Sequence, residues 1–280
     1  MSVTNRIIYS NNGVFTDLTK DLNRYQVGTS VVTDWIATQD YLYMGALAPF
    51  NHFYVKATAP SVVASNVMSI EYWDGTVWVP AYKVDDETVG LTKSGYITFF
   101  PDKQKGWSSE STNDRGDQIT GLTGLSIYDM YWMRVKLSLN IPLGFTLSWV
   151  GQIFSDDNDL ASEFPDLVRA KMLLSFGALK TDWEEQHVKA AELIVQDLIS
   201  SEVISWKGQL LVREEFTLAS IQKVAQLIYN ALGDDYLDQR DAAASEYKRR
   251  LDKSAFRIDN NSNALLSPQE AVSRTGFMSR

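Results

Sequence analysis

The pattern of apolar and polar positions changes partway along the chain. Before residue 156, short segments rich in aromatic and β-branched residues are separated by Gly, Pro and Asn, which is typical of strands. After it, apolar residues recur at the three- and four-residue spacing of helices. We therefore expect an α+β protein with an antiparallel β-sandwich over residues 1–155, an α-helical bundle over residues 156–256 and a tail over residues 257–280.

The clearest strand signal is a hairpin from Ser69 to Pro80. Asp74 and Gly75 favour a two-residue type I′ turn, because both central positions of that turn need a positive φ. In that register Trp73 lies opposite Thr76. Alternation then predicts a core face of Ile70, Tyr72, Val77 and Val79. The other face would carry Glu71, Trp73, Thr76 and Trp78.

A second alternating segment runs from Tyr131 to Leu139. Its predicted core side holds Tyr131, Met133, Val135, Leu137 and Leu139. Its predicted solvent side holds Trp132, Arg134, Lys136 and Ser138. Residues 1–33, with short apolar pieces such as residues 6–9, read as an irregular or edge-strand entry. Further strands are expected near Trp35 and near residues 41–45, 53–57, 96–100 and 145–154, and residues 102–123 read as a long polar loop.

Two helices are expected early in the second half. Pro165 suits the first turn of a helix that would end near Leu179, because its missing N–H costs nothing there. Thr181 and Glu184 have the spacing of a capping box at the start of the next helix. The apolar face of that helix would hold Trp183, His187, Ala190, Ala191, Ile194 and Leu198.

Two more helices complete the predicted bundle. Residues 204–212 read as a loop, after which Thr217 is expected to cap a helix that ends at Gly233. A last helix would span about residues 236–256 and bury Leu237, Ala244, Tyr247 and Leu251. The tail that follows has no apolar period and is expected to be flexible in the free subunit.

Composition narrows the class of protein. The chain has 280 residues, 45% of them hydrophobic, and no cysteine, which excludes disulfides, a thiolate zinc site and a cysteine nucleophile. No apolar run approaches the roughly 18 residues of a membrane span, and the first residues lack the layout of a signal peptide. We therefore expect a protein made in a reducing cytoplasm, without membrane contact.

The net charge of −9 lies mostly in the helical half. Residues 1–155 hold 11 Lys and Arg against 14 Asp and Glu, whereas residues 156–256 hold 12 against 19. Tight binding of nucleic acid needs a basic surface that neutralises phosphates. The sequence therefore argues against a protein that wraps DNA or RNA.

The residues give no catalytic pattern. GxSxG, HExxH and phosphate-loop motifs do not occur in the sequence. His52 and His187 fall in different predicted domains, and His187 lies on the apolar face of its helix, which favours core packing over proton transfer. We predict no enzyme activity, no catalytic residue, no cofactor and no bound metal.

Two other features have both a functional and a structural interpretation. Trp73 and Trp78 could form a surface that stacks on a sugar or a protein, or could be covered by a second sheet or the long loop, which is the favoured interpretation. Residues 259–270 carry Asp259, Asn261, Asn263 and Glu270 at positions 1, 3, 5 and 12 of a calcium loop. Position 6 is Ala264 rather than glycine, which favours a plain polar turn.

These segments resemble a known family. TDWEEQHVKAAELIVQDL (181–198), ISWKGQLLV (204–212), IYNALG (228–233) and YKRR (247–250) resemble the helical bundle of tailed-phage head-to-tail connector (neck adaptor) proteins. EYWDGTVWVP (71–80), GLTKSGYITF (90–99) and YWMRVKL (131–137) are similar to a β module of phage neck and baseplate structural proteins. The plainest connectors are mainly helical, so the long β region departs from them.

The resemblance implies a structural virion protein, located in the neck of a tailed phage and made in the host cytoplasm. It would form a ring of about twelve copies between portal and tail, with DNA passing through the lumen and with the portal and other neck or tail proteins as partners. The tail would dock on a partner through Arg274, Phe277, Met278 and Arg280. The alternative is a baseplate or host-attachment protein with a carbohydrate-binding β module.

Overall fold

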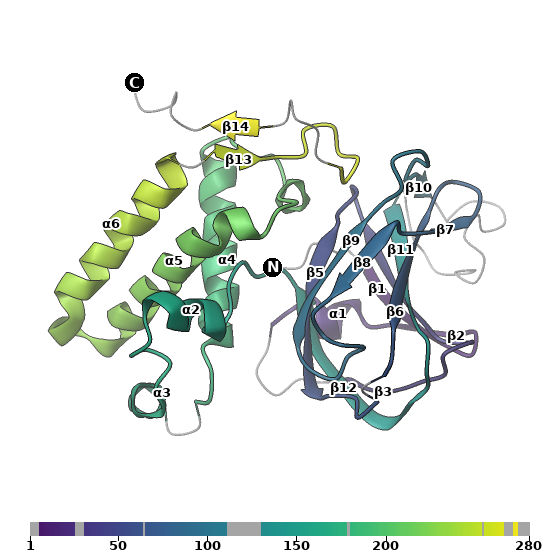
Figure 1. Ribbon diagram of the computed structural model, residues 1–280, viewed down its shortest axis with the longest axis horizontal. Helices are drawn as coiled ribbons and strands as arrows, with labels where there is room; N and C mark the ends of the chain where they lie inside the picture. Colours follow the sequence, from purple (N-terminus) through teal and green to yellow (C-terminus); the bar gives the residue numbers. More distant parts are fainter. Residues whose placement is uncertain are drawn as a thin grey trace. The chain divides into compact units, whose positions relative to one another are not determined.

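The computed structural model of the chain describes residues 6–25, 31–63, 65–110, 130–177, 180–253, 255–265 and 271–273. It divides the chain into two units, the first of Met1–Gln152 with Asp259–Leu265 and the second of Ile153–Ile258 with the described residues after 265. Strands build the first unit and helices dominate the second (Figure 1). The predicted α+β order, with an antiparallel β region before the helices, is confirmed.

The first unit contains two sheets in which every described pairing is antiparallel. The larger sheet has the order β2 (Val14–Asp17), β1 (Arg6–Asn11), β4 (Tyr41–Ala46), β11 (Met130–Leu137), β6 (Met68–Trp73) and β7 (Trp78–Pro80), with β10 (Ser109–Glu110) beside β11. The five-stranded sheet has the order β3 (Val31–Trp35), β12 (Ile141–Gly151), β5 (His52–Ala59), β9 (Gly95–Phe100) and β8 (Lys83–Asp86). A short helix, α1 (Thr19–Leu22), follows β2.

One hydrophobic core joins residues from both sheets. Met44, Tyr72 and Met133 enter it from the larger sheet, and Phe53 and Ile97 enter it from the smaller one, all of them fully buried. Successive side chains of a strand point to opposite faces, so alternate residues reach this core. The burial of Met133, Val135 and Leu137 confirms the predicted core side of β11, while Leu139 lies beyond the strand and is 41% exposed.

The hairpin forms, but its predicted register is wrong. Trp73 pairs with Trp78 rather than Thr76, so four residues form the turn instead of two. The carboxylate of Asp74 accepts hydrogen bonds from the backbone N–H of Thr76 and of Val77, both at 2.8 Å. These two bonds hold the pKa of Asp74 below its usual value and fold the longer turn. Val77 consequently leaves the core face and is 53% exposed.

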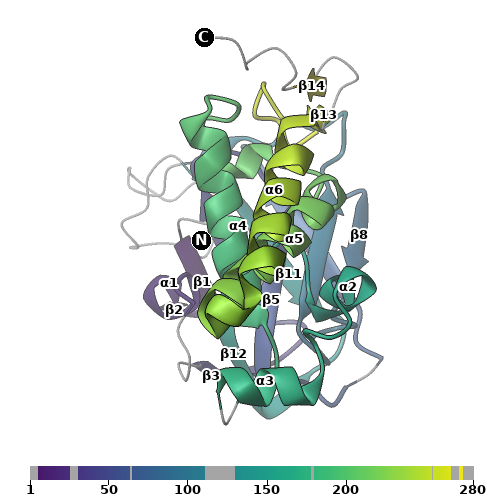
Figure 2. The same cartoon turned by 90° about the vertical axis from the view of Figure 1, so that its left-hand side faces the viewer.

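The second unit contains most of the helices. They are α2 (Asp157–Glu163), α3 (Ala170–Phe176), α4 (Glu184–Ser200), α5 (Glu214–Leu232) and α6 (Leu237–Lys253), with short 3₁₀ turns η1 (Lys207–Gln209) and η2 (Asp234–Tyr236). Figure 2 shows α4, α5 and α6 side by side, and α5 packs against both of the others. Two apolar clusters form between them, one around Ile194 and Phe216 and the other around Trp183 and Val224.

The predicted starts of three helices are wrong. Helix α4 begins after Trp183 with no side-chain cap, so the box of Thr181 and Glu184 does not form. Thr217 lies inside α5 and its hydroxyl donates to the carbonyl of Arg213, because α5 already begins at Glu214. The stretch after Pro165 is a turn, and α3 begins only at Ala170. Gly233 does end α5, with a φ of +97°.

The described residues 255–259 and 271–273 form a folded segment. Strand β13 (Ala255–Arg257) pairs with β14 (Ala271–Ser273), and Phe256 stacks on Phe216 with ring centroids 4.6 Å apart. Ile258 and Asp259 are fully buried. The prediction of a flexible tail is therefore wrong for these residues. Within α6, the stripe is Ala243, Tyr247 and Leu251, whereas Leu237 is 39% exposed and Ala244 only partly buried.

Candidate functional site

The outer face of the larger sheet carries an aromatic cluster. Trp73, Trp132, Tyr43 and Ile8 are buried there together. Trp132 lies flat over Gly45, where an added Cβ would come within 2.8 Å of the ring. The predicted solvent side of β11 is therefore partly covered. Trp73 is only 4% exposed, so its ring is not available for surface recognition.

A cation closes the rim of this cluster. The guanidinium of Arg134 lies 4.5 Å from the ring centroids of both Tyr41 and Trp78. Glu71 holds it in place with a contact of 2.6 Å and also accepts from Lys136 at 3.1 Å. Two cation–π contacts and a charge-assisted hydrogen bond to the carboxylate fix the guanidinium. Of the two tryptophans proposed for recognition, only the half-buried Trp78 keeps part of its ring open to solvent.

A buried polar cluster in the helical unit has the connectivity of a catalytic triad. His187 Nδ1 lies 2.8 Å from Ser155 Oγ, and His187 Nε2 lies 3.2 Å from Asp157 Oδ1. Ser155 Oγ also lies 2.7 Å from Ser220 Oγ. In a hydrolase such a serine would attack a substrate, with the histidine as its base.

Burial removes that possibility for the cluster as it stands. Ser155 and Ser220 are fully buried and His187 is 1% exposed, so a substrate cannot reach the hydroxyls. Asp157 is further engaged by the backbone N–H of Trp183. The cluster instead satisfies buried polar groups and ties the start of α2 to α4 and α5. The predicted core position of His187 is confirmed. No signal in the sequence predicted its contact with Ser155, 32 residues away, or the contact of Ser155 with Ser220, 65 residues away.

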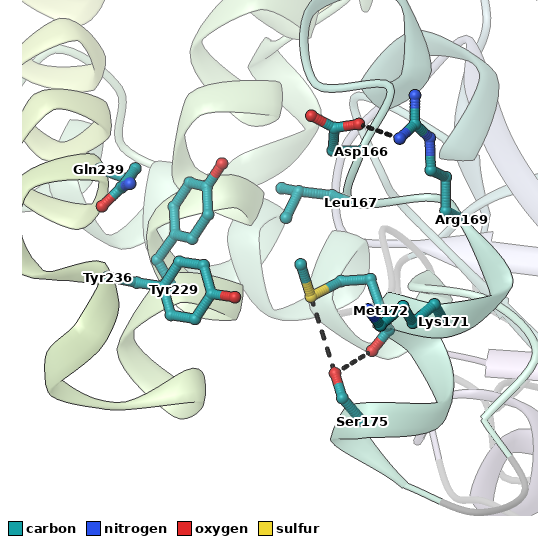
Figure 3. Close-up of a pocket in the computed structure, with 9 residues that line it drawn as sticks. All are labelled: Asp166, Leu167, Arg169, Lys171, Met172, Ser175, Tyr229, Tyr236 and Gln239. Carbon is teal, nitrogen blue, oxygen red and sulfur yellow. Dashed lines mark hydrogen bonds and ion pairs between the residues drawn. The ribbon is translucent and has the colours of Figure 1, made fainter.

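The helical unit also has an open cavity of about 600 Å³ (Figure 3). It lies between residues 166–175 and the connection from α5 through η2 to α6. Its lining consists of Asp166, Leu167, Arg169, Lys171, Met172, Ser175, Tyr229, Tyr236 and Gln239. The sequence patterns did not predict this cavity, because its two walls are about sixty residues apart and meet only in the folded chain.

The calcium-like loop is a polar turn in the residues that are described. The carboxylate of Asp259 accepts from the backbone N–H of Ala264 at 2.8 Å and of Asn263 at 3.2 Å. Ala264 adopts the positive φ of +59° that position 6 needs, although it is not glycine. Glu270 lies outside the described residues. Throughout the described ranges, His, Cys, Asp and Glu form no group of three that could hold a metal ion.

The residues predicted to dock on a partner belong to the tail. These residues, Arg274, Phe277, Met278 and Arg280, lie outside the described residues. In the described part of the chain, every helix is too short or too polar to span a bilayer.

Among the described residues, Lys207 has a pKa that its surroundings lower strongly. Burial lowers the pKa of its amine from 10.5 to about 8, and the nearby carboxylate of Glu192 opposes the shift. Between pH 8 and 10.5 the unfolded chain keeps this proton while the folded chain loses it, so stability should rise with pH in that window. We expect Lys207→Met to raise the free energy of unfolding at pH 7, because it removes a buried charge. It should also reduce the increase of stability between pH 8 and 10.5.

Urea unfolding of both proteins at pH 7 and pH 9.5 measures this effect. Lys248→Met is the matched control, because Lys248 is exposed on α6. Equal pH dependence in the wild type and in Lys207→Met would contradict the assignment to Lys207.

Comparison of the sequence with known protein families gave no match, and neither did comparison with curated proteins. The function has to be inferred from the residues of this chain.

Proposed function

We propose that this chain is a structural protein of a tailed-phage virion, a head-to-tail connector that forms a ring between portal and tail. The observation that carries the proposal is the position, in the folded chain, of the segments that resemble connector proteins. The segments similar to connector proteins coincide with α4, the η1 loop, the end of α5 and the end of α6. These helices pack side by side as one layer of the unit.

The finer description of the fold belongs to the same proposal. Two antiparallel sheets that share one core support a β-sandwich as the first domain. Three helices with two apolar clusters support a helical bundle as the second. A connector of this kind would carry its β-sandwich as an added module on the ring-forming bundle.

Charge supports a ring through which DNA passes without being held. The helical segment has seven more acidic than basic residues, 19 against 12. Even the cations of α6 are partly neutralised, because Glu246 binds both Arg249 and Arg250. A lumen lined by such helices would repel phosphates. We propose that about twelve copies form the closed ring on the portal. The tail residues Arg274, Phe277, Met278 and Arg280 would contact the portal or a neighbouring copy.

Electron microscopy of purified protein and of virions tests the proposal. We expect rings of the purified chain, or density for the protein in the neck directly below the portal. A monodisperse monomer that is absent from the neck would overturn it. Location only at the distal baseplate would instead favour the second candidate, a host-attachment protein with a carbohydrate-binding module. The partly buried Trp78, which packs against Tyr43, is the supporting observation for that candidate.

A further inference from the structure

The open cavity of the helical unit is built as a preformed binding groove. Its volume of about 600 Å³ falls within the usual range of ligand sites. Figure 3 shows the phenol rings of Tyr229 and Tyr236 on one side of the space and the side chain of Met172 on the other. Leu167, 1% exposed, forms its apolar floor.

The aromatic wall is fixed in place. The rings of Tyr229 and Tyr236 stack with centroids 5.7 Å apart and an angle of 18° between their planes. Phe164 packs edge-on against Tyr229 at 6.3 Å. Burial raises the pKa of Tyr229, so its hydroxyl stays protonated and uncharged at neutral pH. An aromatic or long apolar side chain could therefore insert between the tyrosines and the thioether without reordering them.

The elements that line the cavity also carry exposed leucines. Leu174 on α3 is 59% exposed, and Leu237 at the start of α6 is 39% exposed. Each of them is next in sequence to a residue that lines the groove. A small molecule confined to the cavity would leave these leucines in water, whereas a polypeptide segment could cover them as well.

The rim of the groove is basic within an acidic unit. Its lining includes two cations, Arg169 and Lys171, and one anion, Asp166. Arg169 and Asp166 pair at 2.8 Å with both side chains 72% exposed, an arrangement that exchanges easily with other partners. Lys171 is exposed and has no ion pair in the part of the chain that the structure describes. The groove therefore complements a negative charge.

We propose that this groove binds a short acidic segment of a partner protein. Its aromatic or large apolar side chain inserts between Met172 and the tyrosine pair, and a neighbouring carboxylate pairs with Lys171. This inference rests on the groove alone and does not depend on the virion assignment, so either proposal can fail without the other.

A pair of peptides tests the proposal on the full-length chain. The probe is the acetylated and amidated pentapeptide Gly-Glu-Trp-Glu-Gly, and its neutral match is Gly-Gln-Trp-Gln-Gly. NMR of ¹³C-methyl methionine reports on Met172 directly. We expect the Met172 methyl signal to shift on titration, with the acidic peptide binding roughly three- to fivefold tighter than the neutral one at low salt.

Variants separate the two parts of the site. Lys171→Gln should abolish the preference for the acidic peptide. Lys248→Gln should leave this preference unchanged, because Lys248 is exposed on α6 and does not line the groove. Tyr236→Ala should weaken both peptides at least tenfold, and its melting curve shows whether the fold is retained. An unmoved Met172 signal would overturn the proposal, as would the same peptide preference in the wild type and in Lys171→Gln.

Discussion

Replacing Asp40 by alanine is expected to lower the free energy of unfolding of the β unit by about 3 to 5 kcal/mol. The carboxylate is fully buried and accepts from the backbone N–H of Ile36 at 2.6 Å and of Asn12 at 2.7 Å. The hydroxyl of Tyr9 lies 3.3 Å from it. It thus joins the turn after β1 to the turn after β3. Alanine would remove the acceptor that the N–H groups of Asn12 and Ile36 share, and it would leave the hydroxyl of Tyr9 with the carbonyl of Asp34 alone.

The neighbouring tyrosine supports this description of the site. Burial raises the pKa of Tyr9, and the charges of Asp40 and Asp34 raise it further. Its hydroxyl therefore remains a donor to its acceptors at any ordinary pH. Asp40→Asn keeps the shape but presents an N–H₂ group to one of the donors, so we expect an intermediate loss of about 2 kcal/mol.

Urea unfolding followed by tryptophan fluorescence measures these losses. Asp85→Ala is the matched control, because Asp85 pairs with Lys83 at the surface with half of its side chain exposed. Its loss should stay within about 0.5 kcal/mol. A loss below 1 kcal/mol for Asp40→Ala would show that the carboxylate does not organise the two turns.

Sequence patterns predicted the strands whose faces differ in polarity. β11 is the clearest case, because Met133, Val135 and Leu137 alternate with polar residues and reach the core. The patterns missed β2 and β8, whose residues are mostly exposed: Val14 is 69% exposed, and β8 reads Lys-Val-Asp-Asp. An edge strand with little apolar burial has no alternation to detect.

Caps and turns were harder to predict because side chains far away in the sequence compete for the same backbone groups. The backbone N–H of Trp183 is taken by the carboxylate of Asp157, 26 residues earlier. In the hairpin the competing contact is local. The carboxylate of Asp74 accepts from the N–H groups of Thr76 and Val77, and this favours a four-residue turn over the two-residue turn that Asp74-Gly75 suggests. Local preferences worth about 1 kcal/mol are easily overridden by such contacts.

The candidate sites show the same limit. The position of His187 on a buried helix face was predictable from its spacing to Ile194 and Leu198. Its contact with Ser155 and the wall formed by Tyr229 and Tyr236 depend on how the helices pack. Periodicity identifies which face of a helix is buried, but it does not identify the residues that this face meets.

Replacing Gly90 by alanine is expected to destabilise the β unit by about 3 kcal/mol. Gly90 has a φ of +65°, and an added Cβ would lie 2.4 Å from the carbonyl oxygen of Asn66. That carbonyl cannot easily move, because the Asn66 side chain donates to the carbonyl of Leu139 at 3.1 Å and accepts from its N–H at 3.0 Å. The N–H of Gly90 is itself held by Asp86 at 2.7 Å.

Gly13→Ala is a control that separates the two causes. Gly13 has a similar φ of +81°, but nothing lies within 4 Å of the position its Cβ would take. It should therefore lose only the backbone preference, about 1 kcal/mol. The difference between the two variants in urea unfolding gives the steric contact alone. Equal losses at the two positions would mean that the loop around Gly90 relaxes, and that its close approach to Asn66 does not constrain the fold.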